Sequence, residues 1–190
     1  MFSLFKKQKI TKQDLTNQLT ECIGRVHEYV YDTFSKTINE FDKDKVHTEC
    51  FYYSMHLFRS NFPPNEIIRG AIGQAIKKEF GSKISESDFH LIAQKIESRD
   101  KIYWEIYDNF FNHGKKMAIQ SDFGFLFLGN SEFEGDELDD MPFNLGMGAH
   151  TGYLISILFT AYLKDVKSIL DTEKKRLFRK FEIPNGVLNF

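Results

Sequence analysis

Residues 142–163 read PFNLGMGAHTGYLISILFTAYL, and this stretch contains no charged side chain. Its length matters because a helix needs about 20 consecutive apolar residues to cross the hydrocarbon core of a bilayer. The first half contains three glycines and several polar residues, and only Tyr153 to Leu163 is densely apolar. A short apolar segment suits a buried core helix better than a membrane span. We therefore predict a buried, uncharged helix near residues 149–163, and we do not expect integral membrane insertion.

Helical periodicity continues on both sides of this stretch. Apolar residues recur every three or four positions from Leu15 to Phe41, after a helix start that Thr11 and Asp14 indicate. Similar patterns occupy residues 46–58, 68–80, 89–117 and 166–181. Residues 123–128 break the pattern and suit either a short extended segment or a packed loop. The sequence predicts an all-α fold, a single-domain bundle of five or six helices over residues 1–190.

Composition and cysteine content narrow the class of protein. The 190 residues are 42% hydrophobic and include 20 Phe and 8 Tyr, so aromatic rings must make up much of the core. The net charge of −2 gives no indication of nucleic-acid binding. Cys22 and Cys50 are the only cysteines, which is typical of reduced thiols in a cytoplasmic protein. Residues 1–10 are rich in lysine, and we interpret them as a flexible basic arm.

An acidic segment precedes the uncharged stretch. It concentrates six negative charges in nine residues, at Glu132, Glu134, Asp136, Glu137, Asp139 and Asp140. The segment resembles the start of a calcium-binding loop, but Met141 stands where such a loop needs a bidentate glutamate. Two interpretations remain, a solvated loop that aids solubility and a surface that binds a protein partner with a basic face.

A search for catalytic motifs and cofactor sites gives few candidates. The six histidines form neither a His-Glu-x-x-His pair nor a Glu-x-x-His arrangement, and the two cysteines form no Cys-x-x-Cys site, so we predict no metal site and no cofactor. The candidate ligand pocket is the Gly-rich start of the uncharged stretch, where small residues leave room beside a titratable ring. Its residues are Gly148, His150, Gly152 and Tyr153.

Two classes of function fit these observations. The first is a small cytoplasmic helical interaction protein, such as an adaptor, an inhibitor or an antitoxin-like neutraliser, which binds a basic partner through the acidic segment. The second is a helical bundle that binds an apolar small molecule in a pocket lined by Phe and Tyr. The sequence indicates no catalytic residue, and our interpretation leans away from an enzyme.

Overall fold

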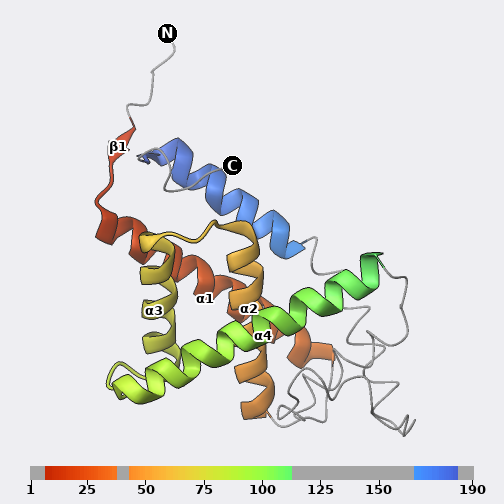
Figure 1. Cartoon of the computed structure of the whole chain (residues 1–190). Coiled ribbons are helices and arrows are strands. Elements are labelled where there is room, and N and C mark those ends of the chain that lie inside the picture. Colours follow the sequence, from red (N-terminus) through yellow and green to blue (C-terminus); the bar gives the residue numbers. More distant parts are fainter. Residues whose placement is uncertain (1–6, 38–42, 113–164, 184–190) are drawn as a thin grey trace, which may run out of the picture.

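A computed structural model describes residues 7–37, 43–112 and 165–183 of the chain (Figure 1). In chain order its elements are β1 (Gln8–Lys9), α1 (Lys12–Thr37), α2 (Lys43–Asn61), α3 (Glu66–Phe80), α4 (Glu86–Asn112), a helical segment at residues 165–180 and β2 (Phe181–Glu182). The chain is an all-α bundle, which confirms the predicted fold class. The buried helix predicted near residues 149–163 and the extended segment predicted at 123–128 lie outside the described residues.

Local signals in the sequence explain where the helices begin. At the start of α1, the Thr11 hydroxyl accepts a hydrogen bond from the backbone N–H of Asp14 at 3.0 Å. Ser85 caps α4 in the same way, accepting from the N–H of Asp88 at 3.1 Å. Asn65 caps α3 through its side-chain oxygen. These caps satisfy backbone donors that have no partner within the helix.

The ends of α2 and α3 also follow from single residues. Pro63 disfavours helical geometry at the residue before it, and α2 ends at Asn61. Gly81 follows α3 with a φ of 104°, a conformation that residues with a Cβ rarely adopt. The turn after it leads the chain into α4.

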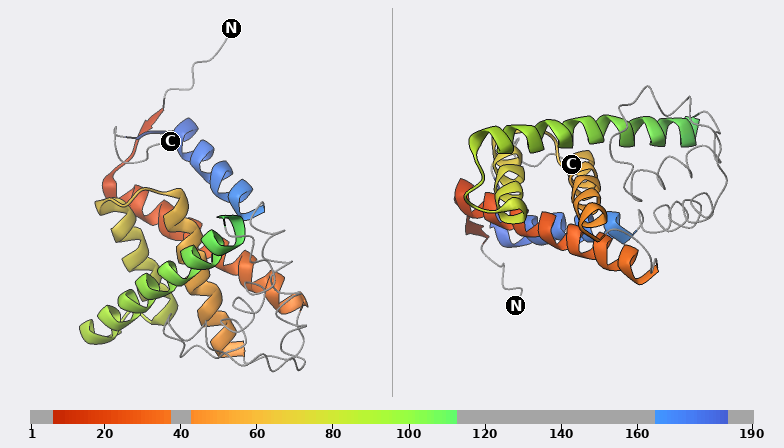
Figure 2. Two further views of the ribbon diagram at one scale, coloured as in Figure 1. Left: turned by 45° about the vertical axis from the view of Figure 1, so that its right-hand side comes forward. Right: turned by 90° about the horizontal axis from the view of Figure 1, so that it is seen from below.

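The described helices form three layers (Figure 2). The middle layer consists of α2 and α3, while α4 runs across one side of it. On the other side lie α1 and the helical segment 165–180. Helix α1 packs on both α2 and α3, and α2 also packs on α4. Side chains of α1, α2 and α3 therefore meet in the interior, although they are far apart in the sequence.

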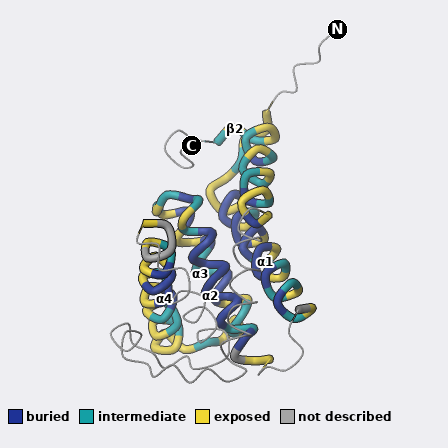
Figure 3. Tube along the Cα trace, turned by 90° about the vertical axis from the view of Figure 1, so that its right-hand side faces the viewer, coloured by how far each residue is buried: buried dark blue, intermediate teal, exposed yellow. Residues whose placement is uncertain are grey.

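The central helix of the described region is α2, and it is buried on nearly all sides (Figure 3). Every residue from 49 to 58 is buried, including Glu49, Ser54 and His56. Around it pack the apolar stripes of α1, α3 and α4, which contribute side chains such as Ile23, Ile68 and Ile106. The sequence predicted a one-sided apolar face for this helix, so its burial on the polar side is a finding of the structure.

A buried polar network joins that side of α2 to α4. The Arg99 Nε lies 3.1 Å from both carboxylate oxygens of Glu49, and the Tyr103 hydroxyl donates to Glu49 at 2.6 Å. About two helical turns further along α2, the His56 Nδ1 lies 2.8 Å from Asp100. Burial raises the pKa of Glu49, and the neighbouring Arg99 opposes that shift. The network satisfies polar groups that α2 carries into the core.

Segments from the two ends of the chain lie side by side. Strands β1 and β2 pair in parallel, with Gln8 opposite Phe181 and Lys9 opposite Glu182. Gln8 and Lys9 belong to the predicted basic arm, so the arm contacts the C-terminal segment at these residues. Cys22 and Cys50 are both free and buried. None of the helices in the described ranges is long and apolar enough to cross a membrane.

Candidate metal centre

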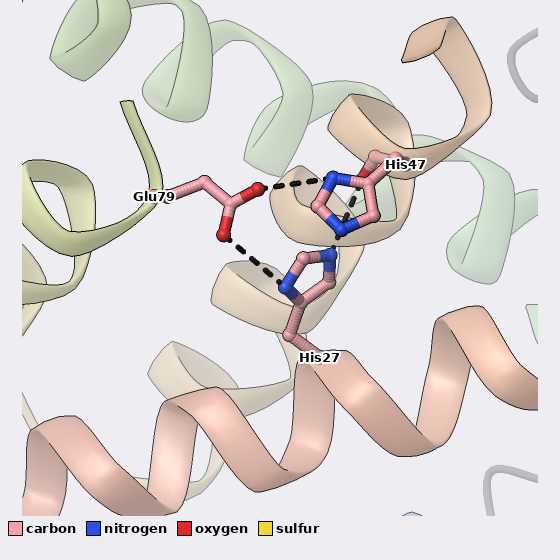
Figure 4. A group of neighbouring side chains, drawn as sticks. All are labelled: His27, His47 and Glu79. Atoms are coloured by element: carbon pink, nitrogen blue, oxygen red, sulfur yellow. Dashed lines mark hydrogen bonds and ion pairs between the residues drawn. The ribbon is translucent and has the colours of Figure 1, made fainter. Parts of the chain in front are cut away.

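The site residues predicted from the sequence are not in the described part of the chain. The acidic segment at Glu132 to Asp140 and the pocket at Gly148 to Tyr153 both lie outside it. The candidate site that the structure brings together is a different one. It consists of His27 from α1, His47 from α2 and Glu79 from α3 (Figure 4).

The three side chains converge from three helices onto one point. The His47 Nδ1 lies 3.0 Å from one carboxylate oxygen of Glu79. The His27 Nδ1 lies 3.5 Å from the other carboxylate oxygen. One ligand atom from each residue lies within 4.8 Å of the other two. Figure 4 shows the carboxylate facing both rings.

The packing of the helices determines these positions. His27 follows Val26 on the buried stripe of α1, and its ring packs edge-on against Phe51 of α2 at a centroid distance of 5.4 Å. His47 is in the first turn of α2, and Glu79 is the residue before the last one of α3. The site therefore lies where the start of α2 and the end of α3 meet the middle of α1.

Exposure increases across the site from one ligand to the next. The side chains of His27, Glu79 and His47 are 8%, 20% and 41% exposed. Such a gradient places one imidazole in the core and leaves the other within reach of solvent.

One hydrogen bond determines the tautomer of His27. The Nε2 of His27 lies 3.2 Å from the backbone carbonyl oxygen of His47. A carbonyl oxygen only accepts hydrogen bonds, so Nε2 must carry a proton and donate it. In a neutral imidazole the lone pair is then on Nδ1, the atom that faces Glu79. A hydrogen bond from the second ring nitrogen to a backbone carbonyl is also the usual arrangement behind a metal-ligating histidine.

The His27 ring is neutral near pH 7. Burial and, to a smaller extent, the neighbouring His47 lower the pKa of His27 to about 4, although the carbonyl hydrogen bond opposes the shift. The Nδ1 lone pair of His27 and the carboxylate of Glu79 are then two acceptors that face each other. Such a pair is stable only when a proton or a metal ion lies between them.

The protonation of Glu79 also depends on its surroundings. Burial raises the pKa of Glu79, and His47 counteracts that shift. Without a cation, the carboxyl group therefore retains a proton more readily than an exposed glutamate does. A bound metal ion would replace that proton and stabilise the carboxylate.

The spacing of the donor atoms suits a small transition-metal ion. Tetrahedral zinc with bonds of about 2.0–2.2 Å separates its ligand atoms by about 3.3–3.5 Å. The distance from the His27 Nδ1 to the Glu79 Oε2, 3.5 Å, is close to that value. The 3.0 Å contact of the His47 Nδ1 is to the other oxygen, Oε1, and is somewhat shorter. Two imidazoles and one carboxylate also form the ligand set of zinc sites that keep a fourth position open.

A cleft of about 390 Å³ adjoins the cluster. His27 and Glu79 line it, together with Gly24 and Glu28 of α1 and Lys78 of α3. His47 is not among the lining residues. An exogenous ligand in the cleft would therefore reach the site from the side of His27 and Glu79.

Comparisons with known proteins provide no further guidance. No family model, curated protein or solved structure matches the chain. The evidence for a metal site is therefore the geometry and chemistry of the three side chains.

Sequence reasoning missed all three residues of this cluster. His27, His47 and Glu79 lie on three separate helices, and no short motif links them. One signal was present in the sequence, because His27 lies next to Val26 and one turn from Ile23 and Val30 on the stripe predicted to be buried. A histidine on an apolar stripe needs polar partners, but the stripe does not show where they come from.

Proposed function

We propose that this chain binds a divalent transition-metal ion, Zn²⁺, through His27, His47 and Glu79. The observation that carries the proposal is the contact between His27 and Glu79. The Nδ1 lone pair of His27 faces a carboxylate oxygen at 3.5 Å, while its other nitrogen donates to a carbonyl. A cation between the two acceptors converts this unfavourable contact into two coordinate bonds.

A cluster held together only by hydrogen bonds explains less of the geometry. In that interpretation His47 donates to Glu79 at 3.0 Å, a good hydrogen-bond distance. The His27 contact at 3.5 Å is beyond the usual range for an N–H···O bond. The hydrogen-bonded interpretation needs a proton on Glu79 to explain the His27 contact, whereas a metal ion accounts for both contacts at once.

The donor set favours zinc over the hard cations. Calcium and magnesium prefer oxygen ligands, whereas imidazole nitrogen suits zinc and its first-row neighbours. Among the described residues of the cluster, two of the three donors are imidazoles. Cobalt(II) fits the same ligands and provides a visible absorption spectrum for the test.

Removing one ligand is expected to weaken zinc binding at least tenfold. Glu79→Gln keeps the shape of the side chain but removes the carboxylate charge, and His47→Ala removes the more exposed imidazole. Changes in the shell outside the ligands already cost about 10–100-fold in affinity, so loss of a ligand should cost no less. The measurement is zinc affinity of the untagged chain by competition with a coloured chelator, with circular dichroism to verify folding.

His90→Ala is the matched control for these variants. His90 is an exposed histidine on α4, outside the cluster, and its loss should leave the affinity unchanged. Equal zinc affinities for the native chain, Glu79→Gln and His47→Ala would contradict the proposal.

A second candidate function has an observation of its own. A groove of about 530 Å³ lies between the end of α2, α3 and α4. Its lining includes the apolar side chains Phe62, Ile72, Phe89 and Trp104 and the charged side chains Arg59, Arg69, Glu97 and Asp100. Its volume is in the range of small-molecule sites. This groove favours the alternative function, binding of an apolar small molecule, at a different place from the predicted pocket.

Fluorescence of Trp104 can report binding in the groove, because Trp104 lines the groove, is the only tryptophan of the chain and is 54% exposed. Titration with decanol, an uncharged apolar probe, is expected to shift Trp104 emission to shorter wavelength as water leaves the ring. Gly73→Leu should reduce the response, because the new side chain would extend toward Phe89 and fill the groove. Leu91→Ala, on the exposed surface of α4, is the control. An identical response from Gly73→Leu would place the probe elsewhere.

The interaction role of the acidic segment remains a prediction. Residues 132–140 lie outside the described part of the chain, and so do the contacts by which they would bind a basic partner. The cytoplasmic location inferred from Cys22 and Cys50 likewise stays a proposal.

A further inference from the structure

The proposed metal ion would have one coordination position that the cluster does not fill. His27, His47 and Glu79 provide three donors, and a tetrahedral ion needs a fourth. Two of the three ligands line the 390 Å³ cleft, whereas His47 does not. A molecule that enters this cleft from solvent would therefore meet two of the three proposed ligands.

A lysine lies on the same side of the cleft. Lys78 precedes Glu79 on α3, and its Nζ lies 4.0 Å from the point where a Cβ on Gly24 would be. Gly24 is three residues before His27 on α1, which corresponds to about 4.5 Å along the helix axis. Lys78 therefore lines the same cleft as the two proposed ligands His27 and Glu79. A side chain at Gly24 would extend into the space next to the ammonium group.

Lys78 forms no ion pair within the described residues. The other cation of the cleft, Arg25, is engaged by Glu173 at 2.9 Å and by Glu21 at 3.9 Å. A metal ion in the cluster would therefore share the cleft with an ammonium group that forms no ion pair among the described residues, although Glu21 and Glu28 also line this cleft. The two positive charges repel each other, and a shared anion would remove the repulsion.

We propose that the cleft binds a small oxyanion, a carboxylate or phosphate group, that ligates the metal ion and pairs with Lys78. This inference depends on the proposed zinc function. A carboxylate or phosphate has more than one oxygen, so it can offer one to the metal and a second to an ammonium group that lines the same cleft. Glu28 also lines the cleft, and its negative charge opposes the anion.

The geometry implies a reciprocal linkage between metal and anion. If the anion strengthens metal binding, the metal must strengthen anion binding by the same factor. Removal of the Lys78 charge has two opposite effects. It relieves the repulsion of the bare metal ion, and it weakens the advantage that the anion provides. A general effect on folding would change metal affinity in the same direction with and without the anion. Opposite changes of affinity in the two conditions would therefore point to the anion itself.

The test measures Co²⁺ affinity in a non-coordinating buffer at constant ionic strength, first alone and then with acetate or inorganic phosphate. Lys78→Gln is expected to raise affinity roughly three- to tenfold without the anion, because it removes a like charge from the cleft that the metal site adjoins. With the anion, native chain and variant should converge or exchange order. Glu28→Gln should enlarge the effect of the anion.

Lys77→Gln is the matched control. It removes the same charge from the neighbouring position, where Lys77 lies over the Phe89 ring and outside the cleft. The control also cancels any binding of acetate or phosphate to free metal. An anion effect of equal size in the native chain, Lys77→Gln and Lys78→Gln would overturn the inference and leave the zinc proposal intact. Failure of the native chain to bind metal in the first step would overturn both.

Discussion

Replacing Arg99 by Met is expected to lower the free energy of unfolding by about 3–5 kcal/mol at pH 8. Arg99 is 1% exposed, and its Nε lies 3.1 Å from Glu49, which is itself 3% exposed. Without the guanidinium group, the Glu49 carboxylate would be a buried charge with the Tyr103 hydroxyl as its remaining short contact. Chemical denaturation with two-state fitting provides the measurement.

The stability lost in the Arg99→Met variant should be larger at high pH than at low pH. Burial already raises the pKa of Glu49 above 4.5, and loss of Arg99 raises it further. A carboxyl group with a higher pKa in the folded state binds its proton more tightly there. Unfolding free energy therefore falls as pH rises through the folded pKa. The Arg99→Met variant should lose less stability at pH 5 than at pH 8.

Two further variants separate the charge from the packing. Adding Glu49→Gln to Arg99→Met removes the stranded charge but keeps an acceptor for Tyr103, so part of the stability should return. Arg59→Met is the matched control, because Arg59 is 34% exposed and pairs with Asp100 at 3.5 Å. That pair should contribute less than about 1 kcal/mol. Equal losses for Arg59→Met and Arg99→Met would contradict the assigned role of Arg99.

The helix starts were predictable because their causes are local. Thr11 with Asp14 and Ser85 with Asp88 form caps between residues three positions apart. Asn65 likewise caps the N–H of Ile68. A capping residue and its partner are near each other whatever the rest of the chain does. The sequence therefore predicted the beginning of α1 from Thr11 and Asp14 without knowledge of the tertiary structure, and the caps of α3 and α4 are equally local.

The burial of α2 was not predictable in this way. Its sequence has an apolar face, yet Glu49, Ser54 and His56 on the remaining surface are buried as well. They are tolerated because Arg99 and Asp100 of α4 provide partners for Glu49 and His56. Those partners come from a helix about 50 residues further along the chain. A pattern read within one helix contains no information about such pairs.

The metal cluster was even less predictable from the sequence than the burial of α2. Short motifs reveal sites whose ligands share one helix or loop, whereas here each of the three helices contributes one ligand. The sequence could place His27 on a buried stripe, but only the crossing of α1 over α2 and α3 brings His47 and Glu79 to it. Absence of a motif was therefore no evidence against a site.

Acidification of the metal-free protein is expected to remove about 3 kcal/mol of stability through His27 alone. Burial lowers the pKa of His27 from 6.5 to about 4. The unfolded chain thus binds a proton at a pH where the folded protein does not. The stabilisation is fully present above about pH 6.5, and it is lost as the pH falls through about 4. A difference of about 2.5 pKa units corresponds to about 3 kcal/mol.

The measurement compares unfolding free energies from pH 7 to pH 4, with EDTA present, for the native chain and His27→Gln. Glutamine can still donate to the His47 carbonyl but does not titrate, so the variant should have the shallower pH dependence. His90→Gln removes an exposed histidine and should retain the native slope. Parallel curves for the native chain and His27→Gln would mean that His27 is already protonated in the folded protein. Its Nδ1 would then donate to Glu79 instead of offering a lone pair, and the central observation behind the zinc proposal would fail with it.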